Sequence, residues 1–150
     1  MPEYVIAEFN EDFTKVRIYK NGEDSDGKMM NWDEYTDDSY DEYVNSYCSP
    51  MVKHHDTLKE VIVEEGCFNI GSNAFGNCEK IKKVTLPESL NTLGVCCVKG
   101  CRNLQQINIP SNLKVVRSSA FSHCTSLIEM VLPDTVTTLN GTVFYGCKNL

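Results

Sequence analysis

The residues of this chain that could do chemistry are mostly thiols, since the 150-residue sequence holds eight cysteines and three histidines. Thiolates and imidazoles are the usual protein ligands of zinc. Cys48, His54, His55 and Cys67 supply both ligand types within a short stretch. The spacing argues against a site, because no Cys-x-x-Cys pair is present and adjacent histidine side chains point to opposite sides of an extended chain. We therefore expect no metal ion and no cofactor.

A cysteine nucleophile is the second chemistry to consider, because His123 directly precedes Cys124. A catalytic thiol needs a base within hydrogen-bond reach. The repeat described below turns Cys124 inward and leaves His123 on an exposed turn, so we expect no catalytic pair. The stretch Gly22–Gly27 is rich in acidic residues like a calcium loop, but its first ligand position is a glycine, which has no side-chain oxygen. The sequence therefore favours a protein that is not an enzyme.

The elements that position these residues recur every 23 residues. Leucine or isoleucine holds the first position of each unit, and a cysteine column and a proline column keep the same interval. Self-similarity at a fixed period of about 20–50 residues is the signature of solenoids and related repeat folds. We assign four units, which start at Leu58, Ile81, Leu104 and Leu127, and Leu150 falls on the first position of a fifth.

Each unit predicts one strand with a buried face. Apolar residues alternate with polar or small ones at Val61/Val63, Val84/Leu86, Ile107/Ile109 and Met130/Leu132. A second inward-pointing extended stretch follows, with Cys67/Ile70, Leu90/Leu93, Leu113/Val116 and Val136/Leu139 spaced by three. Turn residues come next at Gly71, Gly94 and Asn140-Gly141. The coil closes on Ala74-Phe75, Cys97-Val98, Ala120-Phe121 or Val143-Phe144, and the smaller Cys97-Val98 pair predicts looser packing in the second coil.

A unit of 23 residues cannot bury its apolar face alone, whereas stacked units can. The predicted fold is a leucine-rich-repeat solenoid of right-handed stacked coils, with a short parallel β-sheet on one side and irregular turns on the other. A small α+β N-terminal cap precedes it.

The segments Leu104-Gln-Gln-Ile-Asn-Ile-Pro and Ser119-Ala-Phe-Ser-His-Cys-Thr-Ser-Leu127 resemble the BspA-type, or treponemal, leucine-rich repeat. The resemblance covers residues 58–150. It implies a solenoid fold, and it brings no catalytic residues with it. Similar proteins are often bacterial or protozoan surface proteins that adhere to host or matrix proteins. Glu64, Val98 and Arg117 depart from the repeat pattern.

Residues 1–57 do not follow the period. Alternation at Val5, Ala7 and Phe9, and again at Val16 and Ile18, predicts a β-hairpin over about residues 4–19. The aromatic residues from Trp32 to Tyr47 are spaced as in a short amphipathic helix. The segment is interpreted as a cap that covers the end of the solenoid, with an acidic, aromatic-rich recognition arm as the alternative.

The net charge of −7 is unevenly distributed. Residues 1–57 hold 14 acidic and 5 basic residues, whereas residues 58–150 hold 7 acidic and 9 basic ones. An acidic chain without a basic stripe is unsuited to binding nucleic acid through phosphate contacts.

The absence of a long apolar run predicts no membrane insertion. The N-terminus lacks the features of a signal peptide, which favours a cytoplasmic location, with the cell surface as the alternative that the resemblance implies.

The cysteine column is interpreted as a ladder of buried free thiols, because all four members occupy one interior position. This interpretation fits a reducing compartment, and it predicts that most thiols react with a thiol reagent only after denaturation.

Function in such solenoids is expected on the exposed face of the sheet. Two outward residues per strand form the predicted partner-binding row: Glu60, Ile62, Lys83, Thr85, Gln106, Asn108, Glu129 and Val131. We expect a non-catalytic protein–protein interaction module that uses this row, although the row also suits an ordinary solvated sheet face. The alternatives are a scaffold that assembles through the uncovered last coil, giving a homo-oligomer or a longer array, and a fragment of a surface adhesin.

Overall fold

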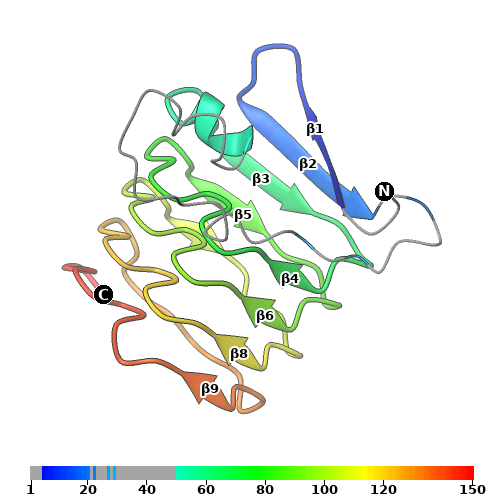
Figure 1. The fold of residues 1–150 in the computed structure, drawn as a ribbon. Helices are drawn as coiled ribbons and strands as arrows, with labels where there is room; N and C mark the ends of the chain where they lie inside the picture. The colour runs from blue at the N-terminus through cyan, green and yellow to red at the C-terminus, as the bar shows by residue number, and fades with distance from the viewer. Residues whose placement is uncertain (1–4, 21, 23–26, 28, 30–49) are drawn as a thin grey trace, which may run out of the picture.

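The computed structural model describes residues 5–20, 22, 27, 29 and 50–150, and it shows a parallel β-solenoid with little helix. Successive coils stack in sequence order, so that equivalent strands of neighbouring units lie side by side (Figure 1). The N-terminal hairpin lies at one end of the stack and the last coil at the other (Figure 1). The predicted leucine-rich-repeat solenoid is confirmed.

The first sheet of the described residues combines the hairpin with the first strands of three coils. Its order is β1 (Val5–Phe9), β2 (Lys15–Lys20), β3 (Glu60–Val63), β5 (Lys83–Thr85) and β7 (Gln106–Ile107). The coil strands are parallel, and Val61, Val84 and Ile107 stand opposite one another. This register matches the 23-residue period and directs the apolar member of each strand into the core.

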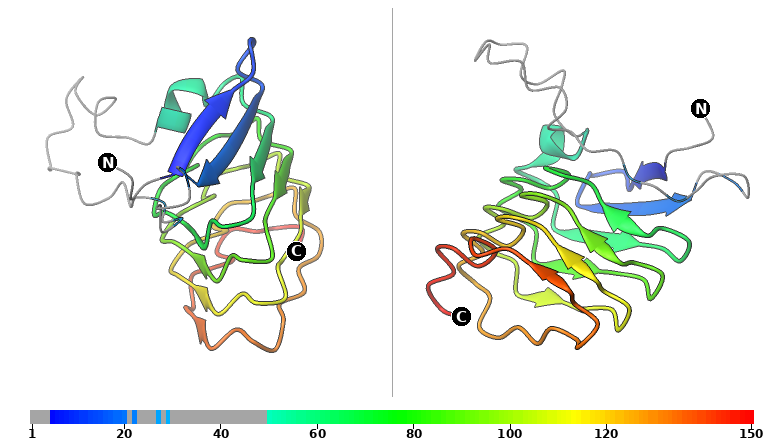
Figure 2. Two further views of the ribbon diagram at one scale, coloured as in Figure 1. Left: turned by 90° about the vertical axis from the view of Figure 1, so that its right-hand side faces the viewer. Right: turned by 60° about the horizontal axis from the view of Figure 1, so that its bottom comes forward.

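A second parallel sheet contains β4 (Asn69–Ile70), β6 (Thr92–Leu93), β8 (Val115–Val116) and β9 (Thr138–Leu139) (Figure 2). The expectation of irregular turns opposite a single sheet was therefore wrong. Each coil repeats the same backbone path, which puts a free carbonyl beside the amides of the next coil. The Phe68 carbonyl accepts from Asn91 N–H at 2.8 Å, and the Asn91 carbonyl accepts from Lys114 N–H at 2.9 Å. The second extended stretch thereby becomes a hydrogen-bonded ladder.

The turns between the two sheets use left-handed backbone at positions that repeat every 23 residues. One column has φ of 60° at Asn77, 75° at Gly100, 59° at His123 and 75° at Gly146. Glycine is favoured in this conformation, and asparagine and histidine tolerate it. Gly94 has a different reason, since a Cβ there would lie 2.6 Å from the Ser72 nitrogen of the preceding coil. Close stacking of coils therefore explains this glycine.

The core runs through the centre of the stack. Leu58, Ile81 and Leu104 are fully buried, and Leu127 is only 2% exposed. Cys97 and Val98 are also buried, so the second coil packs despite its smaller side chains. Phe121 stacks on Phe144 of the next coil, with ring centroids 5.6 Å apart. The columns that define the repeat in the sequence are thus the columns that fill the interior.

The N-terminal hairpin extends the first sheet. β1 and β2 are antiparallel, and β2 then pairs in parallel with β3, placing Val16 opposite Val61. Val16 and Ile18 are fully buried, which joins the hairpin to the solenoid core. The predicted aromatic arm from Trp32 to Tyr47 and its helix lie outside the described residues. The short 3-10 helix η2 (Pro50–His54) leads into the first coil, and the described residues contain no helix long and apolar enough to cross a membrane.

Met29 shows how the start of the chain is fastened to the first coil. The side chain of Met29 is 1% exposed, and its backbone N–H and carbonyl both bond to the Asn69 side-chain amide, at 2.7 and 3.0 Å. Nearby, Gly27 adopts a φ of +70°, and a Cβ there would clash with the Gly66 carbonyl oxygen. The buried hydrogen bonds to Asn69 and the close backbone crossing at Gly66 therefore hold Met29 and Gly27 against the first coil.

The fourth coil departs from the prediction. Residues 127–133 form no strand, so Glu129 and Val131 do not continue the first sheet. The inward residues Met130 and Leu132 are only half-buried, because among the described residues this coil packs on the third coil alone. The lost burial explains why an alternating pattern that forms a strand in the three earlier coils does not form one here.

Candidate functional site

The outward side chains of the first sheet lie in two rows that cross the strands. Lys15, Glu60, Lys83 and Gln106 stand opposite one another in one row. Arg17, Ile62 and Thr85 form the other. Five of the predicted residues lie in these two rows: Glu60, Ile62, Lys83, Thr85 and Gln106. We call these two rows the sheet face.

The sheet face also includes residues that the sequence prediction missed. Lys15 and Arg17 come from β2, and the alternation of buried Val16 and Ile18 was a signal that their neighbours point outward. The parallel pairing of β2 with β3 is what adds them to the site. Such a pairing joins segments about 40 residues apart, and no local pattern specifies it.

The hairpin half of the sheet face holds most of its paired charges. Lys15 Nζ lies 3.3 Å from Glu60 Oε1, and Arg17 Nε lies 2.6 Å from Glu64 Oε1. The Arg17 guanidinium also sits 5.0 Å from the Tyr19 ring centroid. The hydrogen bond that Tyr19 donates to Glu8 raises the pKa of its phenol. These ion pairs are largely exposed to solvent and therefore contribute little to stability.

Asn108 has an internal role that the sequence prediction did not foresee. Its Nδ2 donates to the Leu86 carbonyl at 2.8 Å, and its Oδ1 accepts from the Leu86 N–H at 2.8 Å. The side-chain amide therefore takes the place of a peptide group and extends the β5–β7 ladder by one step. Leu86 is 4% exposed, so its backbone groups need this partner. Asn108 lines the site, but its hydrogen-bonding groups face the protein.

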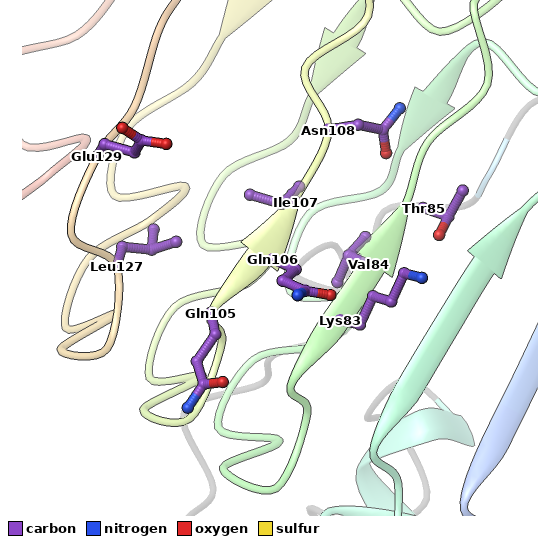
Figure 3. A pocket seen from close by; sticks show the side chains of 9 residues that line it. All are labelled: Lys83, Val84, Thr85, Gln105, Gln106, Ile107, Asn108, Leu127 and Glu129. Atoms are coloured by element: carbon purple, nitrogen blue, oxygen red, sulfur yellow. The ribbon is translucent and has the colours of Figure 1, made fainter.

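The sheet face contains a depression of about 510 Å³ beside β7 (Figure 3). Its walls come from β5, from β7 and from the strandless segment of the fourth coil. Ile107 and the side chains of Leu127 and Glu129 point toward one another across it (Figure 3). The lining residues include five of the predicted row: Lys83, Thr85, Gln106, Asn108 and Glu129. Glu129 thus belongs to the site as a wall of the depression, and Val131, which is 80% exposed, lies outside its lining.

The seven cysteines that the structure describes carry free thiols, and Cys48 lies outside the described residues. Cys101, Cys124 and Cys147 each donate to a backbone carbonyl of the preceding coil, and Cys78, in the first coil, donates to a carbonyl of η2. Burial raises the pKa of the Cys78 and Cys124 thiols to about 12, and it raises the pKa of the Cys101 thiol well above its ordinary value. Neutral thiols are therefore part of the packing. The donor and acceptor distances are 3.8 Å for Cys78 to Met51, 3.3 Å for Cys101 to Phe75, 3.2 Å for Cys124 to Val98 and 3.0 Å for Cys147 to Phe121.

The remaining chemical candidates are not assembled into a site. Within the described residues, no group of three or more histidine, cysteine or acidic side chains could hold a metal ion. His54 instead stacks on Phe13, with centroids 4.2 Å apart. The Cys124 thiol is buried while the neighbouring His123 ring packs edge-on against Tyr145 at 5.5 Å. A raised pKa opposes thiolate formation, so Cys124 lacks the properties of a nucleophile.

Comparison with known proteins supports the fold. Residues 50–150 match the model of the BspA type leucine-rich repeat region, in six copies. Solved structures of a leucine-rich repeat protein of T. pallidum and of one from Bacteroides ovatus each superimpose with a TM-score of 0.64, at 22% and 20% identity. A leucine-rich cell surface protein from Faecalibacterium prausnitzii gives 0.63 at 21% identity. No curated protein sequence matches this chain.

The similar structures differ from this chain in length. Each of the three matches covers 97% of this chain. The chain spans 66% of the T. pallidum protein, 38% of the Bacteroides ovatus protein and 39% of the Faecalibacterium prausnitzii protein. At these identities the likeness concerns the fold alone.

Proposed function

This chain belongs to the BspA-type leucine-rich repeat family, and we propose that it is a non-catalytic protein-interaction module that binds a protein partner through the sheet face. Members of this family are generally interaction or adhesin-like modules without catalytic activity. The observation that supports the proposal is the depression in the sheet face beside β7, where polar and apolar side chains converge on one concave surface. A concave surface with few anchoring polar groups is the usual form of a recognition site.

The composition of the sheet face suits a polar protein surface of modest affinity. Lys83 and Gln106 are exposed, and neither carries a side-chain hydrogen bond or ion pair within the described residues. Ile62 adds apolar area between them and the ion pairs of β2. Aromatic and arginine anchors dominate strong binding sites, and Arg17 with Tyr19 supplies such a pair at the hairpin end.

A capture experiment with a sheet-face variant and a control variant tests the proposal. The sheet-face variant carries Thr85→Lys and Gln106→Glu, which change charge without touching the Asn108 amide. The control variant carries Lys114→Glu and Arg117→Glu, two exposed positions beside the second sheet. Both are compared with the wild type against cell lysate and extracellular matrix proteins. We expect a partner that the wild type and the control retain and the sheet-face variant loses. Equal retention by all three proteins would contradict the proposal.

A second candidate function is assembly through the fourth coil, either with another copy or in a longer array. It is favoured by the exposed apolar residues of that coil, since Leu139 is 52% and Tyr145 is 68% exposed. Light scattering over a range of concentrations tests it, with Leu139→Asp as the variant. Assembly predicts a mass that rises with concentration for the wild type and stays monomeric for the variant. A concentration-independent monomer for the wild type would contradict it.

Different features of the chain support two cellular compartments. Buried free thiols suit a reducing cytoplasm, whereas the family and the Faecalibacterium prausnitzii relative suit a cell surface, where the same sheet face would act as an adhesin site. The capture experiment bears on this point, because a partner from lysate favours the first and a partner from matrix favours the second.

A further inference from the structure

Backbone hydrogen bonds join neighbouring coils along three columns, and one of these columns stops before the fourth coil. In the second sheet, the Lys114 carbonyl accepts from Thr137 N–H at 2.9 Å, which continues the pattern of the two preceding coils. In the turn column, His123 N–H donates to the Tyr145 carbonyl at 2.7 Å. The fourth coil is therefore attached to the third at normal spacing along two of its sides.

The first-sheet column behaves differently. The Lys59 carbonyl accepts from Lys82 and Lys83, at 2.7 and 3.3 Å, and the Lys82 carbonyl accepts from Gln105 and Gln106, at 3.0 and 3.1 Å. The next acceptor in this series is the Gln105 carbonyl. No described N–H donates to it, although residues 127–133 of the fourth coil are fully described. β7 is thus the open edge of the first sheet.

These hydrogen bonds show toward which side each backbone N–H group of β7 points. Gln106 N–H points toward β5, because it donates to the Lys82 carbonyl. Successive amides of a strand point to opposite edges. The Ile107 N–H therefore points toward the fourth coil, into the gap beside the Gln105 carbonyl. An N–H and a carbonyl spaced in this way are the groups that a parallel strand pairs with.

The side chains around this edge match the same interpretation. Val61 and Val84 are 0% and 2% exposed because the next strand covers each of them, whereas their equivalent Ile107 is only half-buried. Ile107 borders the depression together with Leu127 and Glu129 (Figure 3). On the segment that forms the far wall, Ile128 is 75% exposed. The depression thus offers an unpaired backbone edge, an apolar floor and a carboxylate.

We propose that the β7 edge binds an extended peptide segment of a partner protein, which adds to the first sheet as a further strand between β7 and the wall at Leu127 and Glu129. The inference rests on the proposed interaction function and names its partner class. The peptide places an apolar side chain over Ile107, and it places a basic or polar side chain beside Glu129. Its backbone accepts from Ile107 N–H and donates to the Gln105 carbonyl. Strand addition to an exposed sheet edge is a known mode of peptide recognition.

The chain itself supplies a probe with this chemistry. A synthetic peptide of residues 81–87, Ile-Lys-Lys-Val-Thr-Leu-Pro, already pairs in parallel beside a neighbouring strand in the native sheet. Placed against the open edge in the equivalent register, its valine lies opposite Ile107 and a lysine lies near Glu129. A control peptide carries N-methyl groups on the amides that face β7, which removes the donors and keeps every side chain.

The measurement is amide hydrogen exchange and chemical-shift change on the isotope-labelled chain as millimolar peptide is added. We expect the Ile107 amide to become protected and to shift. We also expect the N-methylated peptide to bind at least about tenfold more weakly, because it loses the backbone bonds. The variant Ile107→Pro removes the donor at an edge position that tolerates proline, and Ile107→Val keeps it. Binding should be lost with the first and retained with the second.

Other results would overturn the inference. Equal binding of both peptides would mean that the edge is not used, and no binding at millimolar peptide would mean that it is not accessible to a strand. Protection of Ile107 without peptide would assign the edge to the chain's own fourth coil, or to a second copy if the protection rises with protein concentration. The peptide control keeps the test valid if Ile107→Pro fails to fold. Failure of the proposed function is seen separately, in the capture experiment with the Thr85 and Gln106 variant.

Discussion

Replacing Asn108 by alanine should lower stability and not merely weaken binding. The substitution deletes both bonds to Leu86 and leaves the Leu86 N–H and carbonyl without a partner next to a side chain that is 4% exposed. An unpaired backbone group costs about 1–3 kcal/mol, and water can reach this edge of the sheet, so we expect a total loss of about 2 kcal/mol. With a denaturant slope of roughly 2 kcal/mol per molar urea, the unfolding midpoint falls by about 1 M.

Two further variants make this prediction specific. Gln106→Ala, at an exposed position two residues earlier in the chain, should leave the free energy of unfolding within about 0.5 kcal/mol of the wild type. Asn108→Asp keeps the acceptor for Leu86 N–H but faces the Leu86 carbonyl with a second oxygen. Protonation of the new carboxyl restores the missing donor, so its pKa is raised in the folded state. The stability that this hydrogen bond contributes is therefore present at low pH and is lost as the pH rises through the raised pKa. Equal midpoints for Asn108→Ala and Gln106→Ala would refute the reasoning and return Asn108 to the partner-binding residues.

Three other predictions follow from the thiols and from one glycine. Raising the pH from 7 to 10 should destabilise the fold by about 1.4 kcal/mol for each of Cys78 and Cys124. Their pKa is about 12 when folded against an ordinary 9.0, so the unfolded state loses protons first and stability falls as pH rises from 9 toward 12. Urea titrations at several pH values check this prediction. The free energy of unfolding of Cys78→Ala should fall less steeply with pH than that of the wild type. A thiol reagent at neutral pH should label the half-buried Cys96 and Cys147 first among the described cysteines and the buried ones only in denaturant, as mass spectrometry of digested protein will show. Gly27→Ala should cost more stability than Gly22→Ala in thermal unfolding, because both have positive φ but only Gly27 would clash with a neighbouring carbonyl; equal melting temperatures would contradict this.

The repeat and its core could be predicted from the sequence alone. An interior column must carry the same kind of side chain in each coil, so the spacing of Leu58, Ile81, Leu104 and Leu127 predicts which residues are buried. The alternation around Val61 and its equivalents likewise predicts which neighbours point outward. These properties depend on local periodicity, which is visible in a single sequence.

The conformation of the turns was harder to predict from the sequence. Gly94 marked a turn in the sequence, but its cause is the close approach of Ser72 from the preceding coil. The left-handed positions include Asn77 and His123, where no glycine signals the conformation. Such positions are set by how one coil lies on the next, and they appear in the sequence only as a column without a common residue type.

Three features of the candidate site were decided by tertiary structure. The pairing of β2 with β3 adds Lys15 and Arg17 to the sheet face across a long stretch of chain. The amide of Asn108 turns back onto Leu86, because the ladder there lacks a peptide partner. The segment around Glu129 leaves the sheet, in the coil where the inward residues Met130 and Leu132 are only half-buried. The sequence by itself determined which residues could be buried in each coil. The stacking of one coil on another, through burial and hydrogen bonding that no single coil contains, decided which outward residues form a site and where the sheet ends.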